Sequence, residues 1–547
     1  MSRELAPRAR DAPPATPSAS LVVGAAALSL AAAPLFWLPL CLGGALRAGD
    51  WSSHHFHYFD WVRTALVGHG TLPLYMADAW VTPNFLANAE APSLGPLVWL
   101  LAWLETDAYL KVLIVAHTAL GLFGAFLLAH DLGAERLPAA LVAVIFAFGG
   151  FFVSHLAMGH HWAMGGMWLP LLLMLTRRAA LGSDAALVGA AAVDALVLLS
   201  GQHQPFVWQN LLLGAFAGLW ALRARSLFPL TRAAQVALLA AGLGAVKLLP
   251  MLAEFSDYAP TARIVGLPVQ LLPTTLVGWT QGPGFAPPGL RFAHGAGWWE
   301  YAFYTGALAL VCIAAGLVAA RGVWPLVVPG LCFLVLALQW GGGSAASGPW
   351  ALLQDLPIWR TQRSPSRFLF LAIACLAFAA APGLGRLWRD ARARFGGAAT
   401  CAGIVLLAAV AGDLSLASLA WQRAAVGAPI ASLDHRPRPL VIRLPDAEAR
   451  LSHFEPNLLV YAVSAQRPAR IVLPLRFGPR EAEWAVHPLP AFSHEGKVAI
   501  EVPAGEHEVV LRYRPPWLRA GLGVSAASAG LLIAAGWLRR RARRSAR

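Results

Sequence analysis

Apolar runs of about 20 residues recur along most of this chain, and they constrain its fold more than any other feature. A helix needs roughly 20 apolar residues to cross about 30 Å of hydrocarbon. Apolar residues make up 58% of the chain and charged residues only 13%, which is far from the composition of a soluble domain. The sequence therefore predicts a mainly α-helical polytopic membrane protein.

The formal net charge of +14 does not indicate nucleic-acid binding. The arginines lie in short clusters between apolar runs and in the tail "RRRARRSAR", which is how topology signals are distributed. The five cysteines lie in or beside apolar runs without the paired spacing of a disulfide framework or a zinc site. We interpret the arginines as markers of the cytoplasmic side and the cysteines as packing residues.

Placing the arginine-rich loops in the cytoplasm gives a consistent topology of about twelve spans with both termini inside. The predicted spans cover residues 21–46, 108–130, 137–155, 162–177, 184–200, 205–222, 232–250, 301–320, 324–340, 367–386, 397–417 and 517–538. The apolar segment 92–105 is too short to span, so we expect a re-entrant or interfacial helix there.

This topology divides the chain into five parts. They are a disordered cytoplasmic N-terminus (1–20), a transmembrane domain (21–418) with a long first outer loop (47–107), an extracytoplasmic β-domain (419–516), a last helix (517–538) and a basic tail (539–547). The β-domain is predicted from short, often alternating segments such as "NLLVYAVSA" and "EHEVVLRYRP", separated by Pro and Gly, which are typical of a small antiparallel sandwich.

Titratable and amide side chains gather on the predicted outer face. Ionisable residues at membrane depth are costly and tend to be functional. All histidines except His117 and His130 fall outside or at outer helix ends. The candidate substrate-binding residues are His54, His55, His57, Glu90, His160, His161, Gln202, His203 and Glu300, and the candidate catalytic residue is Asp50. Their convergence from separate segments favours a site at the outer membrane surface.

Simpler roles are open for several of these residues. Asp50 could only cap the helix that begins at Trp51. Asp60 and Arg63, three residues apart on one helix face, suggest an ion pair. His54 and His57 could bind a divalent metal, but no HExxH or other strong ligand spacing is present, which favours interfacial hydrogen bonding and no metal site.

Cations on the same side could bind a phosphate. Lys247 lies about one turn below the outer end of an apolar helix, and it could instead extend its amine to the interface. Arg263, Arg363 and Arg367 lie in or beside outer loops. A lipid-linked phosphate would satisfy these groups, and so would anionic lipid headgroups.

The chain resembles the bacterial YfhO-like membrane proteins, which are similar to the GT-C superfamily of glycosyltransferases. The resemblance rests on "GD" after the first span, followed in order by "PNFLANAEAPSLGPLVWLL", "GHHWAMGGMWLPLLLM", "SGQHQPF", "KLLPMLAEF", "WWEYAFYTG", "LPIWRTQRSPSRFLFL" and "VPAGEHEVVLRYRPPWLRAGLGVS". The chain departs from the pattern at Glu90, where the family would have an amide, and at "FGPREAEW", where it would have a clearer Gly-Trp turn.

The resemblance implies a GT-C-like bundle in the bacterial inner membrane that transfers a sugar from a polyprenyl-phosphate donor to a cell-envelope glycan or lipid outside the cytoplasm. In such enzymes an acid in the first outer loop is essential, and Asp50 matches it. Asp50 would act as general base or orient the acceptor, while Lys247, Arg363 or Arg367 would stabilise the departing phosphate. The alternative class is a lipid-linked-sugar transporter or a non-enzymatic envelope assembly protein with the same outer residues.

Overall fold

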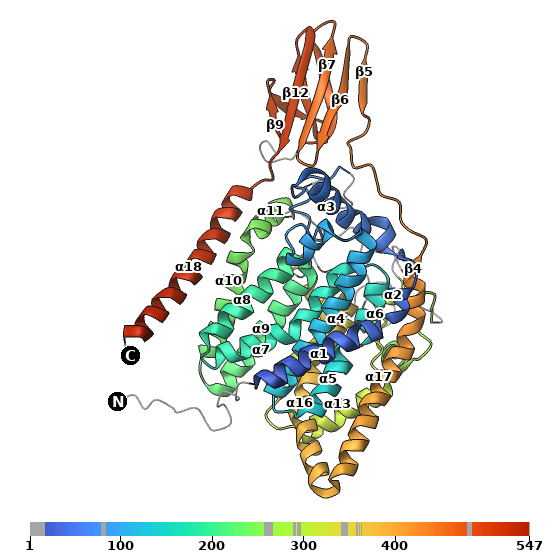
Figure 1. Ribbon diagram of the computed structural model, residues 1–547, viewed down its shortest axis with the longest axis vertical. Coiled ribbons are helices and arrows are strands. Elements are labelled where there is room, and N and C mark those ends of the chain that lie inside the picture. The colour runs from blue at the N-terminus through green and yellow to red at the C-terminus, as the bar shows by residue number, and fades with distance from the viewer. Residues whose placement is uncertain are drawn as a thin grey trace.

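The computed structural model shows a helical bundle that carries a β-domain at one end (Figure 1). It describes residues 17–77, 84–255, 266–287, 292, 297–340, 348–356, 359, 362, 364–477 and 484–545. The helices are α1 (Ala19–Phe36), α2 (Leu38–Leu42), α3 (Phe56–His69), α4 (Thr106–Asp131), α5 (Arg136–Ala147), α6 (Gly150–Ala157), α7 (Leu169–Ala180), α8 (Asp184–Leu199), α9 (His203–Ala224), α10 (Phe228–Leu243), α11 (Ala245–Phe255), α12 (Leu272–Val277), α13 (Ala307–Ala319), α14 (Trp324–Ala337), α15 (Pro349–Leu353), α16 (Leu369–Phe395), α17 (Gly397–Ala425) and α18 (Leu518–Ser545).

Each of the twelve predicted spans contains a helix, which confirms the polytopic helical fold. Among the described residues, seven helical segments are long and apolar enough to cross a membrane. The pair α10 and α11, bent by 81°, makes an eighth if it counts as one span. The helices α7, α8, α13 and α14 have only 12 to 16 residues and complete the bundle as shorter elements.

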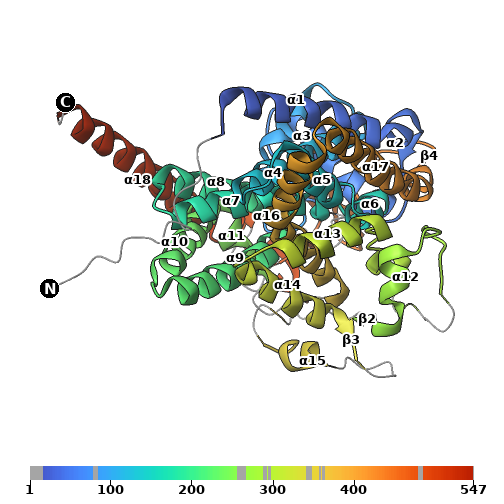
Figure 2. The same cartoon turned by 90° about the horizontal axis from the view of Figure 1, so that it is seen from below.

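The helices differ in how far neighbouring helices cover them. The apolar window of the α16 span is 83% buried and that of the α5–α6 span 72%, whereas those of α17 and α18 are 17% and 6% buried. Figure 2, seen from the end opposite the β-domain, places α1 at one margin of the bundle and α15 at the other. The α5–α6 and α16 spans therefore lie in the interior of the bundle, whereas α17 and α18 lie at its surface.

The first loop folds back over that end of the bundle. Strand β1 (Ala45–Leu46) pairs with β4 (Val426–Gly427), a π-helical turn spans Trp51–His55, and α3 follows it. Segment 92–105 forms a 3₁₀ helix at Pro96–Ala102, too short to span a membrane, with Trp103 78% exposed. A helix of this length agrees with the expectation that the segment is re-entrant or interfacial and does not span the membrane.

The β-domain contains two antiparallel sheets, which confirms the predicted β-rich region. One sheet has the strand order β5-β6-β7-β12-β9 and the other β10-β11-β8. The strands are β5 (Val441–Leu444), β6 (Ala447–Glu455), β7 (Leu458–Ala465), β8 (Ala469–Arg476), β9 (Trp484–His487), β10 (Ala491–His494), β11 (Lys497–Val502) and β12 (Gly505–Tyr513). Alternate side chains such as Val463, Leu473 and Leu511 from both sheets form one buried core. Two further short strands, β2 (Leu267–Pro268) and β3 (Leu338–Gln339), pair within the bundle.

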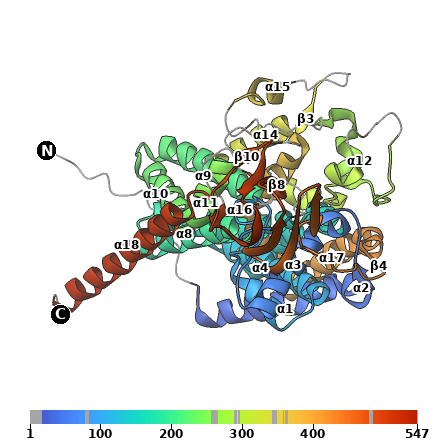
Figure 3. The same ribbon diagram turned by 90° about the horizontal axis from the view of Figure 1, so that it is seen from above.

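The β-domain is fixed to the first loop, and Figures 1 and 3 show it above α3. The ring of Tyr75 lies 4.9 Å from Trp484 and 5.2 Å from Tyr513, measured between ring centroids. The side chain of Asn457 accepts a hydrogen bond from the Leu74 N–H at 2.6 Å and donates one to the Leu72 carbonyl at 3.0 Å. The first loop is therefore held between the bundle and the β-domain.

The expected ion pair between Asp60 and Arg63 is wrong. Asp60 accepts a hydrogen bond from the Thr106 hydroxyl at 3.0 Å. Arg63 instead donates to the Leu104 carbonyl at 3.1 Å and pairs with Glu105 at 2.5 Å. The interfacial segment thus supplies a carboxylate and a carbonyl that a pattern within one helix does not reveal.

Candidate active site

Asp50 begins the π-helical turn Trp51–His55 but does not use its side chain as a helix cap. Its backbone is helical (φ −69°, ψ −11°), and its carboxylate makes no capping hydrogen bond. Its N–H donates to the Met158 carbonyl at 2.9 Å, which ties the residue to the end of α6. A π-helical turn is rare and is often found at functional sites. The carboxylate is therefore directed to other partners.

Gly159 allows this close approach. Its φ is +88°, and a Cβ there would lie 2.2 Å from the Trp51 nitrogen and 2.9 Å from the Asp50 nitrogen. Any larger residue would combine an unfavourable backbone conformation with a clash against backbone atoms. The turn after α6 therefore sets the position of Asp50, and the first loop alone could not have set it.

The Asp50 carboxylate pairs with His160, which is itself held by His155. His160 Nε2 lies 3.2 Å from Asp50 Oδ2, and its Nδ1 lies 2.6 Å from His155 Nδ1. If both rings are neutral, His155 Nδ1–H donates to His160, and His160 Nε2–H donates to Asp50. His155 is fully buried, whereas the Asp50 side chain is 37% exposed. A buried relay thus orients a carboxylate that still faces outward.

His54 and His55 follow Asp50 in the π-helical turn, and Glu90 lies against both of them. His55 Nε2 is 3.2 Å from Glu90 Oε2, and His55 Nδ1 is 2.6 Å from the Gly159 carbonyl. Because both ring nitrogens face acceptors, His55 carries two protons and a positive charge. His54 Nε2 lies 3.9 Å from Asp50 Oδ2 and 3.8 Å from Glu90 Oε2. We call Asp50, His54, His55, Glu90 and His160 the Asp50 cluster.

The pKa values in this cluster follow from burial and from these neighbours. Burial acts to raise the pKa of the Asp50 carboxyl, but the hydrogen bond from His160 and the nearby imidazoles hold it well below its usual range. Burial likewise opposes ionisation of Glu90, and His55 holds the Glu90 pKa far below normal. Burial and the charge of His55 lower the pKa of His54 to about 4. Despite burial, which acts to lower it, Glu90 raises the pKa of His55. Both acids are therefore ionised at neutral pH.

The loop that carries Glu90 is held by hydrogen bonds to α3 and α11. The Glu90 N–H donates to the Asn88 side chain at 3.0 Å, and Asn88 donates to the Tyr58 hydroxyl at 3.1 Å. The amine of Lys247, on α11, is fully buried and donates to the carbonyls of Asn88 at 3.2 Å and Ala91 at 2.5 Å. Lys247 thus ties the loop to α11, and its position gives no support to the predicted contact with a lipid phosphate.

Arg367 and Glu300 form a second, enclosed centre. The guanidinium donates from Nε and Nη2 to the two Glu300 oxygens at 2.8 and 2.6 Å, and from Nη1 to the Gln204 side chain at 2.7 Å. It also lies over the Trp162 ring, 4.4 Å from its centroid. Both side chains of this ion pair are at most 7% exposed. The guanidinium and the carboxylate thus form an enclosed, bidentate ion pair.

The other predicted residues occupy different positions. His161 is buried against His55, with 4.3 Å between ring centroids, and His203 bonds the Ala89 backbone near Glu90. Gln202 is buried at the α8–α9 turn. His57 is buried on another face of the first-loop helix, where His435 and Asp60 are near enough to act on it electrostatically. Arg263 and Arg363 lie outside the described residues.

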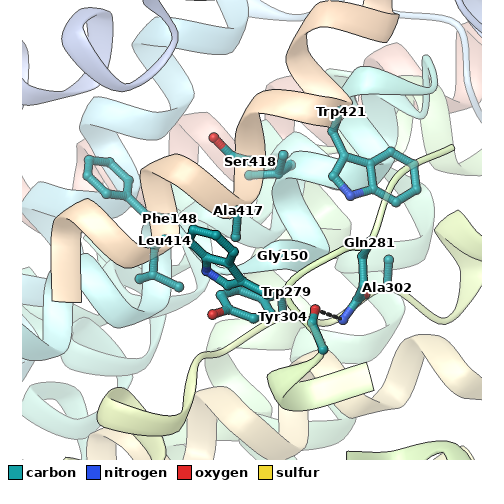
Figure 4. A pocket seen from close by; sticks show the side chains of 12 residues that line it. Phe148, Gly150, Trp279, Gln281, Ala302, Tyr304, Leu414, Ala417, Ser418 and Trp421 are labelled. Atoms are coloured by element: carbon teal, nitrogen blue, oxygen red, sulfur yellow. Dashed lines mark hydrogen bonds between the residues drawn. The ribbon is translucent and has the colours of Figure 1, made fainter. Parts of the chain in front are cut away.

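A small pocket lies between α6, α17 and the segment after α12. Four aromatic side chains, Phe148, Trp279, Tyr304 and Trp421, help to line it (Figure 4). The Trp279 indole N–H and the Tyr304 hydroxyl both donate to Asp413 at 2.9 Å. Within the described part of the chain, no predicted site residue lines this pocket. The pocket is therefore separate from the Asp50 cluster.

Two contributors were missed as site residues. His155 stood out only as one more outer histidine, and its contact with His160 depends on the turn that brings positions 155 and 160 together. Gly159, between "AM" and "HH", gives a weak signal, because a glycine beside histidines is common at helix ends. The roles of His155 and Gly159 both depend on how the chain turns at the end of α6.

Comparisons with known proteins give little further guidance. No protein-family model matches the chain, and no curated protein matches it. Among solved structures, the chain is similar to the arabinofuranosyltransferase AftD from mycobacteria, with 18% identity and a TM-score of 0.46 over 75% of this chain. The match covers only 27% of AftD. A likeness of this size carries no argument about activity.

Proposed function

We propose that this chain is a membrane glycosyltransferase of the GT-C type, acting at the β-domain end of its bundle. The observation that carries the proposal is the Asp50 carboxylate. It is ionised, released from helix capping, oriented by His160 and still 37% exposed. The sequence resemblance to YfhO-like proteins supports a polyprenyl-phosphate sugar as donor and a cell-envelope glycan or lipid as acceptor.

In the proposed reaction, Asp50 binds the acceptor hydroxyl and accepts its proton. The hydroxyl oxygen forms a bond to the anomeric carbon while the bond from that carbon to the phosphate oxygen breaks, and the lipid phosphate leaves with the bonding electrons. A low pKa makes Asp50 a weak base towards a free alcohol. The hydroxyl proton becomes strongly acidic as the new bond forms, however, so late proton transfer suits this carboxylate. Its negative charge also stabilises the positive charge that develops on the sugar ring.

The conservative change Asp50→Asn tests this function. Purified protein in proteoliposomes is given a polyprenyl-phosphate sugar and an acceptor extract, and transfer of labelled sugar is measured. Loss of a general base should lower the rate by about 10²–10⁴-fold. The matched control is Asp390→Asn, an exposed acid near the end of α16, which should leave the rate unchanged.

The result also separates the transferase from the transporter. A transporter would move the lipid-linked sugar across the membrane without cleaving its phosphate bond, and the Asn variant would retain most of that movement. Absence of transfer by the wild-type protein, together with wild-type behaviour of Asp50→Asn in cells, contradicts the proposed function.

A further inference from the structure

Three side chains of the Asp50 cluster place potential metal-ligand atoms close together, and a fourth adjoins two of them. Asp50, His54 and His55 each offer one ligand atom, and these atoms all lie within 4.8 Å of one another. The Glu90 carboxylate adjoins the two histidines, with Oε2 lying 3.2 Å from His55 Nε2 and 3.8 Å from His54 Nε2. The set comprises two imidazole nitrogens and two carboxylates.

The spacing of these atoms suits a small divalent cation. In a tetrahedral zinc site with bonds of about 2.0–2.2 Å, neighbouring ligand atoms lie ~3.4 Å apart. The separations from His55 to Glu90, from His54 to Glu90 and from His54 to Asp50 are 3.2, 3.8 and 3.9 Å. These three separations are close to the tetrahedral value, and a four-ligand site would also require the Asp50 and Glu90 carboxylates to rotate toward each other.

The far side of each imidazole is already held by the protein. His55 Nδ1 donates to the Gly159 carbonyl at 2.6 Å, and His54 Nδ1 lies 2.8 Å from the Ser53 hydroxyl. Metal-binding histidines almost always have such a second partner, which fixes the ring and leaves the other nitrogen for the metal. Here both Nε2 atoms are the ones left facing the carboxylates.

Beyond these ligands, His160 supports Asp50 through its 3.2 Å contact, as hydrogen-bonded partners support ligating carboxylates. The charges also match, because two carboxylates and two neutral imidazoles carry a charge of −2 that one divalent cation would neutralise. On binding, the cation would take the place of the proton that His55 Nε2 shares with Glu90, and that proton would leave to solvent.

We propose that Asp50, His54, His55 and Glu90 bind one divalent transition-metal cation, with Zn²⁺ as the best match. A mixed imidazole and carboxylate set favours zinc or a related metal over Mg²⁺, which prefers oxygen ligands alone. The inference builds on the proposed function, because that function places Asp50 at the reacting centre. Binding itself can be measured without any sugar donor.

The test is a titration of the full-length, detergent-solubilised protein, purified without a polyhistidine tag and stripped with EDTA. Zn²⁺ is added in competition with a chromogenic chelator, and affinity and stoichiometry are measured. We expect one site per chain, weakened more than about 100-fold by His54→Gln or Glu90→Gln, because loss of a ligand exceeds the about 10–100-fold loss from a supporting group. His69→Gln, which changes an exposed histidine at the end of α3, should bind as wild type.

Thermal unfolding of each variant in EDTA shows whether it still folds. If the wild-type protein binds no Zn²⁺, or if folded His54→Gln and Glu90→Gln bind it like wild type, the metal site is refuted. Zinc binding through these residues in a protein that transfers no sugar would refute the proposed function alone. Sugar transfer that persists unchanged after EDTA, without zinc binding, would refute the metal site alone.

Discussion

The Asp50 cluster and the Arg367–Glu300 pair are built from similar charged groups at the same end of the bundle, yet they differ in what is left over. In the pair, both Glu300 oxygens and each of the three guanidinium nitrogens have partners, and neither side chain is more than 7% exposed. In the cluster, the Asp50 side chain is 37% exposed. A charge whose hydrogen bonds are all made inside the protein has none left for a ligand, whereas one that still faces outward can act on a substrate.

The largest effect should come from breaking the enclosed pair. Arg367→Leu leaves the Glu300 carboxylate buried without its cation and should destabilise the protein by about 3–5 kcal/mol. The measurement is equilibrium unfolding in detergent. The double variant Arg367→Leu/Glu300→Leu should be markedly more stable than the single one, because no charge is left unpaired. A single variant within about 1 kcal/mol of wild type would contradict the structural role that we assign to the pair.

A smaller effect, on rate and not on stability, is expected when the relay to Asp50 is cut. His160→Leu removes a hydrogen bond to a charged group, worth about 1.5–3 kcal/mol. If that interaction is made in the transition state, kcat should fall by roughly 10–150-fold with little change in KM. His155→Leu should give a smaller loss in kcat, because His155 contacts His160 and not Asp50 itself. A rise in KM by a similar factor, with kcat unchanged, would show that His160 only supports substrate binding.

The smallest predicted effect concerns the contact between the first loop and the β-domain. Asn457→Ala removes two hydrogen bonds to the backbone of residues 72–74, each worth about 0.5–1.5 kcal/mol. Hydrogen exchange of the Leu74 amide should accelerate while strands β7 and β12 keep their protection. Ser464→Ala, at an exposed position of β7, serves as the control. Unchanged exchange at Leu74 would mean that the aromatic contacts of Tyr75 alone hold the loop.

Much of the helical fold could be predicted from the sequence, because the bilayer demands long apolar runs and the arginines mark their ends. Some strands are harder to recognise from the sequence. Strand β6, "AEARLSHFE", places alanines and charged residues in alternation, so its place between β5 and β7 depends on neighbours far apart in the sequence. Such pairing is set by tertiary contacts, which local pattern does not encode.

The sequence predicts at which end of the bundle the site lies. It does not predict which of the site residues contact one another. Histidines and acids at the β-domain end stand out because such groups are costly near lipid. Which of them meet depends on the π-helical turn, which directs His54 and His55 toward Glu90 and leaves His57 on another face. The departure at Glu90 from the amide of the resembling family is also explained here, since a carboxylate is what His55 pairs with.

The most direct test compares Asp50→Asn with Glu300→Gln in two measurements on the same preparations, the rate of sugar transfer and the midpoint of thermal unfolding. We predict that Asp50→Asn unfolds within a few degrees of wild type but loses about 10²–10⁴-fold in rate, whereas Glu300→Gln unfolds at a clearly lower temperature. Transfer at the wild-type rate by a folded Asp50→Asn protein would contradict the central claim that Asp50 performs the chemistry.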